Sequence, residues 1–173
     1  MPYIKNTISG IAPHFTMKRQ LDDYHKQYYY KLHERSELLK ADNYSSMKKL
    51  ASWKLRMLRN WDSIEVVEMS LPNTNISALK MGELISAKVV LNLGDINPDD
   101  VMVEFVAGQR INDQMPEPMA IHELSLEKMD GNLALYSVDI TTSRSGVFDV
   151  AFRITPKHPL LPHRQDFNLV IWA

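Results

Sequence analysis

The chain has 173 residues, of which 45% are hydrophobic and 24% are charged, and its formal net charge is −1, so we expect one core, or one core with an appendage. It has no cysteine, which excludes a disulfide-stapled scaffold, thiol catalysis and a thiolate metal site. No apolar stretch is long enough to cross a membrane, and the N-terminal residues MPYIKN lack the apolar block of a signal peptide, so we expect a cytoplasmic protein.

The first predicted element is a helix that runs from about Thr16 to the pair Leu38 and Leu39. Thr16 is a suitable N-cap, and the acidic residues Asp22 and Asp23 lie near the positive end of the helix dipole. Apolar residues recur at helical spacing along one stripe: Met17, Leu21, Tyr24, Tyr28 and Leu32. This stripe predicts an amphipathic helix that docks on another surface.

A second helix is predicted over about 46–60, after a break at the residues Ala41-Asp42-Asn43. Its expected buried stripe consists of Met47, Leu50, Ala51, Lys54, Leu55 and Leu58. Trp53 lies off this stripe. The opposite face is basic, with Lys48, Lys49, Arg56 and Arg59. Because it lacks base-reading residues and a stacking platform, and the pI is about 6.6, we expect no nucleic-acid partner.

From Trp61 onward the hydrophobic period changes from helical to two. Alternating runs separated by turn-rich pieces predict seven strands, at 63–71, 83–93, 99–107, 119–129, 133–140, 147–154 and 168–172. Asp130-Gly131-Asn132 is a tight hairpin signal between two of them. The predicted fold class is therefore α+β: an N-terminal helical arm of two helices, followed by an immunoglobulin-like antiparallel β-sandwich of about seven strands.

The charge distribution supports the same division into two domains. Residues 1–61 carry twelve Lys/Arg against five Asp/Glu, a net charge of +7, whereas residues 62–173 carry a net charge of −8. We therefore expect a helical domain at 1–61 and a β-sandwich domain at 62–173, whose opposite charges favour docking, although salt screens this attraction.

The first thirty residues contain a motif, F-x3-R-x-L-x-D-Y-x3-Y-Y, with two isoleucines upstream. It is formed by Phe15, Arg19, Leu21, Asp23, Tyr24, Tyr28 and Tyr29, with Ile4 and Ile8 before it. The motif resembles the closing segment of the catalytic core of α-glucan (glycogen/maltodextrin) phosphorylases, where a similar run opens the last helix.

Later segments resemble a β-rich extension that follows the catalytic core in some bacterial and archaeal phosphorylases of this family. They are Trp61, then 98–104 (PDDVMVE), then Gly146-Val147-Phe148, Arg153-Ile154, Pro156, His158-Pro159-Leu160 and Trp172. The series covers nearly the whole chain in order. The resemblance implies that the chain is the C-terminal segment of such an enzyme, comprising the last helix of the core and a β-sandwich extension.

The resemblance also implies a parent reaction, the reversible phosphorolysis of α-1,4-linked glucose, which depends on pyridoxal phosphate held by a lysine in an α/β core. This chain has no G-T-x-x-M-K type segment to carry that lysine, and no phosphate-binding glycine-rich loop. We therefore expect no catalytic and no cofactor-binding residue in this chain, and a structural or docking role. The implied partner is the catalytic core of the parent enzyme.

Two other functions stay open at this point. In a carbohydrate-binding module, exposed Trp61, Tyr136 or Trp172 would stack on an α-glucan; in a free-standing interaction domain, the partner would be an unrelated protein. Against the first alternative, we expect Trp61 and Trp172 to be buried where helices and sandwich join. We also expect the fragment to self-associate through an apolar surface around Tyr3, Ile4, Ile8 and Phe15.

Other candidate chemistry has weaker support. Asp22, His25 and His33 lack the i, i+4 histidine spacing of a zinc helix, so we expect no metal site. His158 and His163 flank a proline-rich loop without a nucleophile to serve. Acidic residues in or beside strands, namely Glu104, Glu123 and Glu127, are expected to be charges that discourage sheet aggregation rather than a catalytic pair.

Overall fold

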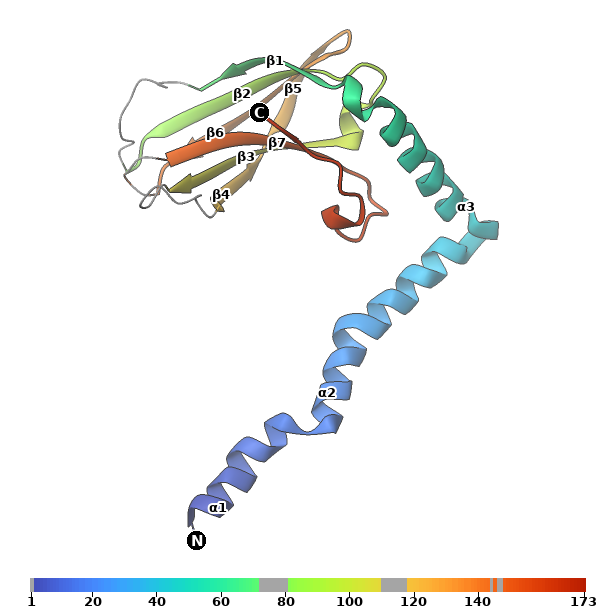
Figure 1. The fold of residues 1–173 in the computed structure, drawn as a ribbon, viewed down its shortest axis with the longest axis vertical. Helices are drawn as coiled ribbons and strands as arrows, with labels where there is room; N and C mark the ends of the chain where they lie inside the picture. Colours follow the sequence, from blue (N-terminus) through green and yellow to red (C-terminus); the bar gives the residue numbers. More distant parts are fainter. Residues whose placement is uncertain (1, 72–80, 110–117, 144, 146–147) are drawn as a thin grey trace. The chain divides into compact units, whose positions relative to one another are not determined.

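The computed structural model describes residues 2–71, 81–109, 118–143, 145 and 148–173 (Figure 1). The chain forms two compact units, Met1–Ser52 and Trp53–Ala173. The second unit includes helical residues from Trp53 onward, whereas the sequence analysis places the boundary after residue 61. In the described part of the chain, no helix combines the length and apolar character that a membrane crossing requires.

The first unit is mainly helical. Its elements are α1 (Pro2–Asn6), a π-helical turn (Thr7–Ile11), a 3-10 turn (Ala12–Phe15), α2 (Met17–Tyr24), a second π-helical turn (His25–Tyr29) and the start of α3 (Tyr30–Asn60). Thr16 precedes α2 in an extended conformation, and its side chain accepts a hydrogen bond from the backbone N–H of Arg19 at 3.2 Å. This confirms the predicted N-cap.

The predicted break between the two helices is confirmed inside α3. Residues 41–44 have non-helical dihedrals, and Asp42, Asn43 and Tyr44 have positive φ values of 50°, 54° and 62°. Aspartate and asparagine tolerate this left-handed conformation because their short polar side chains bond locally. α3 therefore consists of two helical segments that meet at these residues.

The buried face of the last helical turns differs from the predicted one. Trp53, Met57 and Trp61 are buried at spacings of four, and the side chain of Met57 is 0% exposed, whereas Leu58 is 54% exposed and Leu55 is also exposed. The predicted stripe through Leu55 and Leu58 is therefore wrong. The large rings decide the orientation, because burying an indole removes more apolar area from water than burying a leucine.

Polar contacts hold these helical turns to the rest of the second unit. Arg56 forms an ion pair with Asp100 at 2.7 Å, and Lys54 donates to the backbone oxygen of Asp166 at 3.1 Å. The Trp53 ring lies 5.4 Å from the ring of Phe167, centroid to centroid. The end of α3 is thus part of the sandwich unit.

Within the described residues, eight strands form two antiparallel four-stranded sheets, which confirms the α+β class. The strands are β1 (Glu65–Ser70), β2 (Leu84–Asn92), β3 (Val101–Gln109), β4 (Pro118–Glu123), β5 (Ser125–Asp130), β6 (Leu133–Thr141), β7 (Phe148–Pro156) and β8 (Ile171–Trp172). The first sheet has the order β1-β2-β6-β5 and the second β4-β3-β7-β8. Figure 1 labels β1 to β7. Between β5 and β6, Gly131 has a φ of +60°, as the predicted hairpin requires.

One predicted strand, 119–129, is two strands in different sheets. β4 pairs with β3 in the second sheet, and β5 pairs with β6 in the first. Leu124 lies between them, is buried, and its N–H donates to the backbone oxygen of Val103 at 2.8 Å. The chain therefore changes sheets at a buried apolar residue, which the alternating pattern does not distinguish from a continuous strand.

The core lies between the two sheets and is built by alternate residues of the central strands. Buried side chains come from both sheets: Ala87, Val89, Leu91, Ala134 and Tyr136 from the first, and Val103, Phe105, Phe152 and Ile154 from the second. The rings of Phe105 and Phe152 contact edge to face at 5.8 Å. The opposite faces of the same strands carry both polar and apolar residues, such as Glu104 and Val106 on β3.

Candidate functional site

A row of residues crosses the second sheet on the face that points away from this core. Cross-strand partners place Glu123 of β4 opposite Glu104 of β3, Glu104 opposite Arg153 of β7, and Arg153 opposite Trp172 of β8. Directly opposite residues of antiparallel strands share one face. We call Glu123, Glu104, Arg153 and Trp172 the outer row.

The centre of the outer row is a buried carboxylate held by two arginines. Glu104 is 4% exposed, and its Oε2 accepts from Arg153 Nε at 2.8 Å. Arg164 Nη1 lies 3.0 Å from both carboxylate oxygens. Because a buried charge without partners is costly, this arrangement fixes the turn that carries Arg164 onto the sheet.

The ends of the outer row are open to solvent. Glu123 accepts from Lys157 Nζ at 2.6 Å in an exposed ion pair. Trp172 is 54% exposed, and the Arg153 guanidinium lies 5.5 Å from its ring centroid. The predicted burial of Trp172 is therefore wrong. β8 is an edge strand of two residues, and the Trp172 ring lies beside Arg153 and not in the core.

The other two residues predicted as sugar-stacking rings lie inside the fold. Trp61 and Tyr136 are both buried, and the Tyr136 hydroxyl donates to the backbone oxygen of Pro98 at 3.4 Å. Burial, with a smaller effect of the nearby Asp99 charge, raises the pKa of Tyr136 to about 12. Neither ring has a face free for a sugar, so Trp172 is the one of the three that offers one.

The histidines of the proline-rich loop stabilise turns. His158 Nδ1 accepts from the Leu160 N–H and His163 Nδ1 from the Gln165 N–H, each at 3.1 Å. The His158 ring lies 4.7 Å from the Trp53 ring, and burial lowers its pKa, with opposing effects of Asp100 and Arg56. Both histidines therefore have structural roles in this loop.

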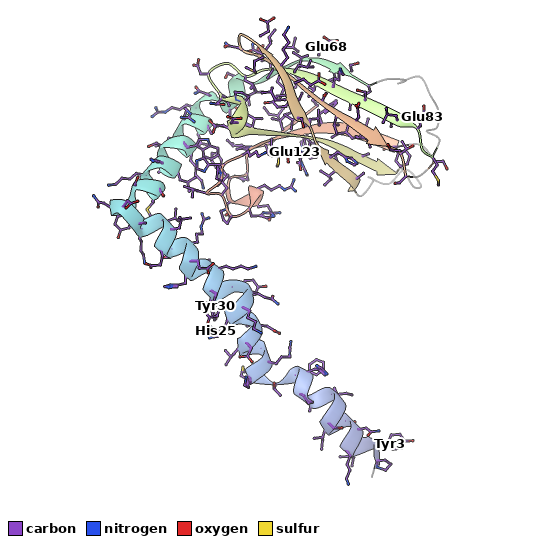
Figure 2. All side chains as sticks on the ribbon, turned by 180° about the vertical axis from the view of Figure 1, so that it is seen from behind. Tyr3, His25, Tyr30, Glu68, Glu83 and Glu123 are labelled. Carbon is purple, nitrogen blue, oxygen red and sulfur yellow. The ribbon has the colours of Figure 1, made fainter. Side chains whose placement is uncertain are left out.

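The residues weighed as metal ligands in the first unit have other contacts. Asp22 pairs with Lys18 at 2.8 Å, and the His25 ring packs edge to face on Tyr29 at 5.3 Å. Among the residues that the structure describes, no three His, Asp or Glu side chains gather as a metal site would require. The His25 ring also lies 5.9 Å from the Tyr30 ring, centroid to centroid, and both residues are labelled in Figure 2.

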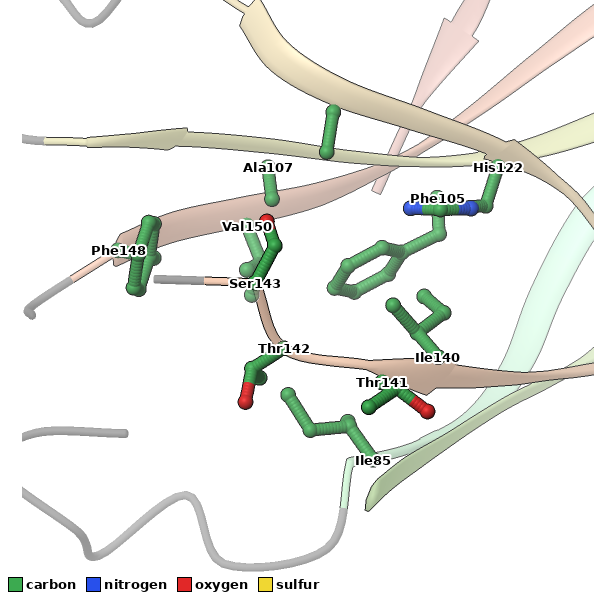
Figure 3. A pocket seen from close by; sticks show the side chains of 11 residues that line it. Ile85, Phe105, Ala107, His122, Ile140, Thr141, Thr142, Ser143, Phe148 and Val150 are labelled. Carbon is green, nitrogen blue, oxygen red and sulfur yellow. The ribbon is translucent and has the colours of Figure 1, made fainter. Parts of the chain in front are cut away.

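A pocket of about 350 Å³ lies between the two sheets at one end of the sandwich (Figure 3). Its lining is mainly apolar, with one imidazole and three hydroxyl groups: Ile85, Phe105, Ala107, Ala120, His122, Ile140, Thr141, Thr142, Ser143, Phe148 and Val150. Sequence analysis did not single out His122 or this pocket. The facing small residues Ala107 and Ala120 of paired strands are the signal that predicts an underfilled region.

The described lining does not fit pyridoxal phosphate. It provides no lysine for a Schiff base and no arginine or lysine for a phosphate group. An uncharged group suits this pocket better, because the described lining has no lysine, arginine, aspartate or glutamate to pair with a buried charge.

Large apolar side chains of the first unit are exposed. Tyr3, labelled in Figure 2, is 85% exposed. The same holds for Ile4, Ile8, Ile11, Phe15 and Met17. Such a run exceeds the scattered exposed apolar residues of an ordinary surface.

Comparisons with known proteins agree on one family. A family model described as the glycogen phosphorylase C-terminal domain matches residues 61–173. The chain is 27% identical over 173 residues to the maltodextrin phosphorylase of Thermococcus litoralis and 22% identical over 174 residues to the glycogen phosphorylase of Mycobacterium tuberculosis. Each match covers 98% of this chain and 20% of the relative. The chain thus spans about a fifth of the length of the curated relatives it matches.

Proposed function

The chain belongs to the glycogen phosphorylase C-terminal domain family, and from this premise we propose that it is the C-terminal portion of an α-glucan phosphorylase with a structural, docking role. The observation that carries the proposal is the match of nearly the whole chain to one fifth of two phosphorylases. The remaining four fifths of such an enzyme are large enough to hold the catalytic core, to which this portion would attach.

In this proposal the catalytic groups lie outside residues 1–173. Pyridoxal phosphate, on which phosphorolysis would depend, would be held by a lysine of the core. The absence of the lysine segment from this sequence and the unsuitable lining of the pocket both support a non-catalytic role.

We propose that the helical unit docks on the core through its exposed apolar side chains. Its exposed side chains Tyr3, Ile8 and Phe15 are large and apolar, and burying each of them would contribute roughly 1.5–3 kcal/mol. Residues 1–61 also carry the net charge of +7, so an acidic surface on the core would favour the encounter.

The test is to read the coding sequence upstream of this chain and to express the upstream polypeptide and residues 1–173 as two separate chains in one cell. We expect an α/β polypeptide with the lysine segment that co-purifies with residues 1–173. The pair Ile8→Asp and Phe15→Asp should reduce co-purification by tenfold or more, because each buries a charge without a partner.

Asn6→Asp is the matched control, since it also adds a negative charge at an exposed residue of the same helical region and leaves the apolar side chains unchanged. An upstream polypeptide that is fully active and stable alone, and does not bind residues 1–173, would contradict the docking role.

A second candidate function is α-glucan binding at Trp172. The supporting observation is its half-exposed ring, whose indole would pack on a sugar face. Titration with maltoheptaose should then give a saturable change in tryptophan fluorescence that is lost in Trp172→Ala. Leu58→Ala, another exposed position, should retain the change. Absence of any saturable change in the unsubstituted chain would leave docking as the sole role.

We also infer that the sandwich is immunoglobulin-like. The support is its strand order: if β1 to β8 are lettered A, B, C, C′, D, E, F and G, the first sheet is A-B-E-D and the second places C, F and G side by side. This is the arrangement of immunoglobulin constant-type domains with one added edge strand, and without the disulfide.

A further inference from the structure

One strand of the second sheet is only partly covered along its edge. β8 pairs with Arg153 and Ile154 of β7, and Ala173 exchanges two backbone hydrogen bonds with Phe152, at 2.7 and 3.0 Å. Within the described ranges, no strand pairs with the same edge of β7 from Phe148 to Ala151.

The direction of the backbone groups on this open edge follows from the register. Phe152 points its N–H and C=O toward β8, and in an antiparallel ladder every second residue repeats that direction. Val150 lies opposite Ala107 of β3. Its N–H and C=O nevertheless point away from β3, onto the open edge. A new strand could bond both groups without disturbing the existing sheet.

The outermost strands of the two sheets are protected in a way that β7 is not. β1, β4 and β5 each pair with their neighbour through a register shift. Such bulges twist an edge and discourage further pairing. β7 pairs with β3 in continuous register from Phe148 to Pro156, so its open edge has the regular geometry that strand addition needs.

The open edge adjoins the pocket between the sheets. Phe148 and Val150 line that pocket, together with Phe105 and the small residue Ala107 (Figure 3). A strand paired with this edge would direct alternate side chains to the same face as Val150 and Phe148. The described lining has no charged residue, so it favours an apolar side chain at those positions.

We propose that the open edge of β7 binds an extended segment of a partner polypeptide by strand addition. The segment continues the line of β8, antiparallel to β7, and inserts an uncharged apolar side chain into the pocket. Backbone hydrogen bonds to Val150 supply affinity, and the pocket supplies the preference for the inserted side chain.

The test uses residues 1–173 and a capped heptapeptide of alternating leucine and threonine with one terminal lysine. We expect saturable binding in a fluorescence anisotropy titration, and slowed hydrogen exchange of the Val150 amide in the complex. A peptide of the same sequence with N-methylated leucines should not bind measurably, because it cannot form the ladder. Equal binding of the methylated peptide, or no binding of the unmodified one, overturns the proposal.

Two substitutions locate the site. Val150→Pro removes the N–H on the open edge and retains the pairing with β3, so the peptide should bind about tenfold or more weakly, whereas Val150→Thr retains the N–H and should bind normally. Ala107→Leu narrows the pocket and should also weaken binding. If Val150→Pro does not fold, Ala107→Leu and the methylated peptide decide. Undiminished affinity in a folded Val150→Pro or Ala107→Leu variant overturns the proposal.

Discussion

Glu104 shows how one carboxylate can determine the position of a surface turn. It is buried in the outer row and bonds both Arg153 and Arg164. Glu104→Gln keeps the volume but leaves two guanidinium groups without their counter-charge, so we expect the free energy of unfolding to fall by about 3 kcal/mol. Glu123→Gln, in the same row, breaks an exposed pair with Lys157 and should cost less than about 1 kcal/mol. Urea denaturation of both variants makes the comparison, and equal losses would contradict it.

His158 gives the stability of the fold a pH dependence of known sign. Burial lowers its folded-state pKa, and its Nδ1 must be unprotonated to accept from Leu160. The unfolded chain therefore binds the proton more readily, so the stabilisation is present above the unfolded pKa of about 6.5 and is lost as pH falls through the folded pKa. Denaturation at about pH 7.5 and pH 5.5 should show a smaller decrease for His158→Gln than for the unsubstituted chain. An identical decrease would show that His158 does not contribute to it.

At the scale of elements, the last turns of α3 test which face of the helix supports the sandwich unit. Met57 is fully buried and Leu58 is half exposed. Met57→Ala should lower the free energy of unfolding by roughly 2–5 kcal/mol through lost burial and a cavity, while Leu58→Ala should change it by about 0.5 kcal/mol or less. The two variants remove similar volumes from adjacent positions, so a chemical denaturation curve of each separates burial from helix propensity. Comparable losses would mean that the helix buries a different face in solution.

The same elements show what sequence patterns can and cannot predict. Strand positions and the break at residues 41–44 were predictable, because period-two alternation and a cluster of turn-forming residues are local signals. The buried helix face and the change of sheet at Leu124 were not, since both depend on which distant residues are available as neighbours. For the candidate site, Trp172 was predictable as an aromatic residue near the end of a strand, but its exposure depends on the short pairing of β8 with β7. The pocket depends in the same way on which side chains of two sheets face each other.

At the scale of the whole molecule, the exposed apolar residues of the helical unit should govern how residues 1–173 behave in isolation. Tyr3, Ile8 and Phe15 lie open to solvent, and a surface of this kind is covered in a stable assembly or associates with itself. Sedimentation velocity at increasing protein concentration should therefore show self-association, and the pair Ile8→Asp and Phe15→Asp should shift the chain toward monomer. Val150→Pro should leave this association unchanged, because it alters an edge of the sandwich and not the helical surface. Two results would show that the helical apolar surface does not drive self-association. The chain could stay monomeric at the highest concentrations, or its association could depend on Val150 and not on Ile8 and Phe15.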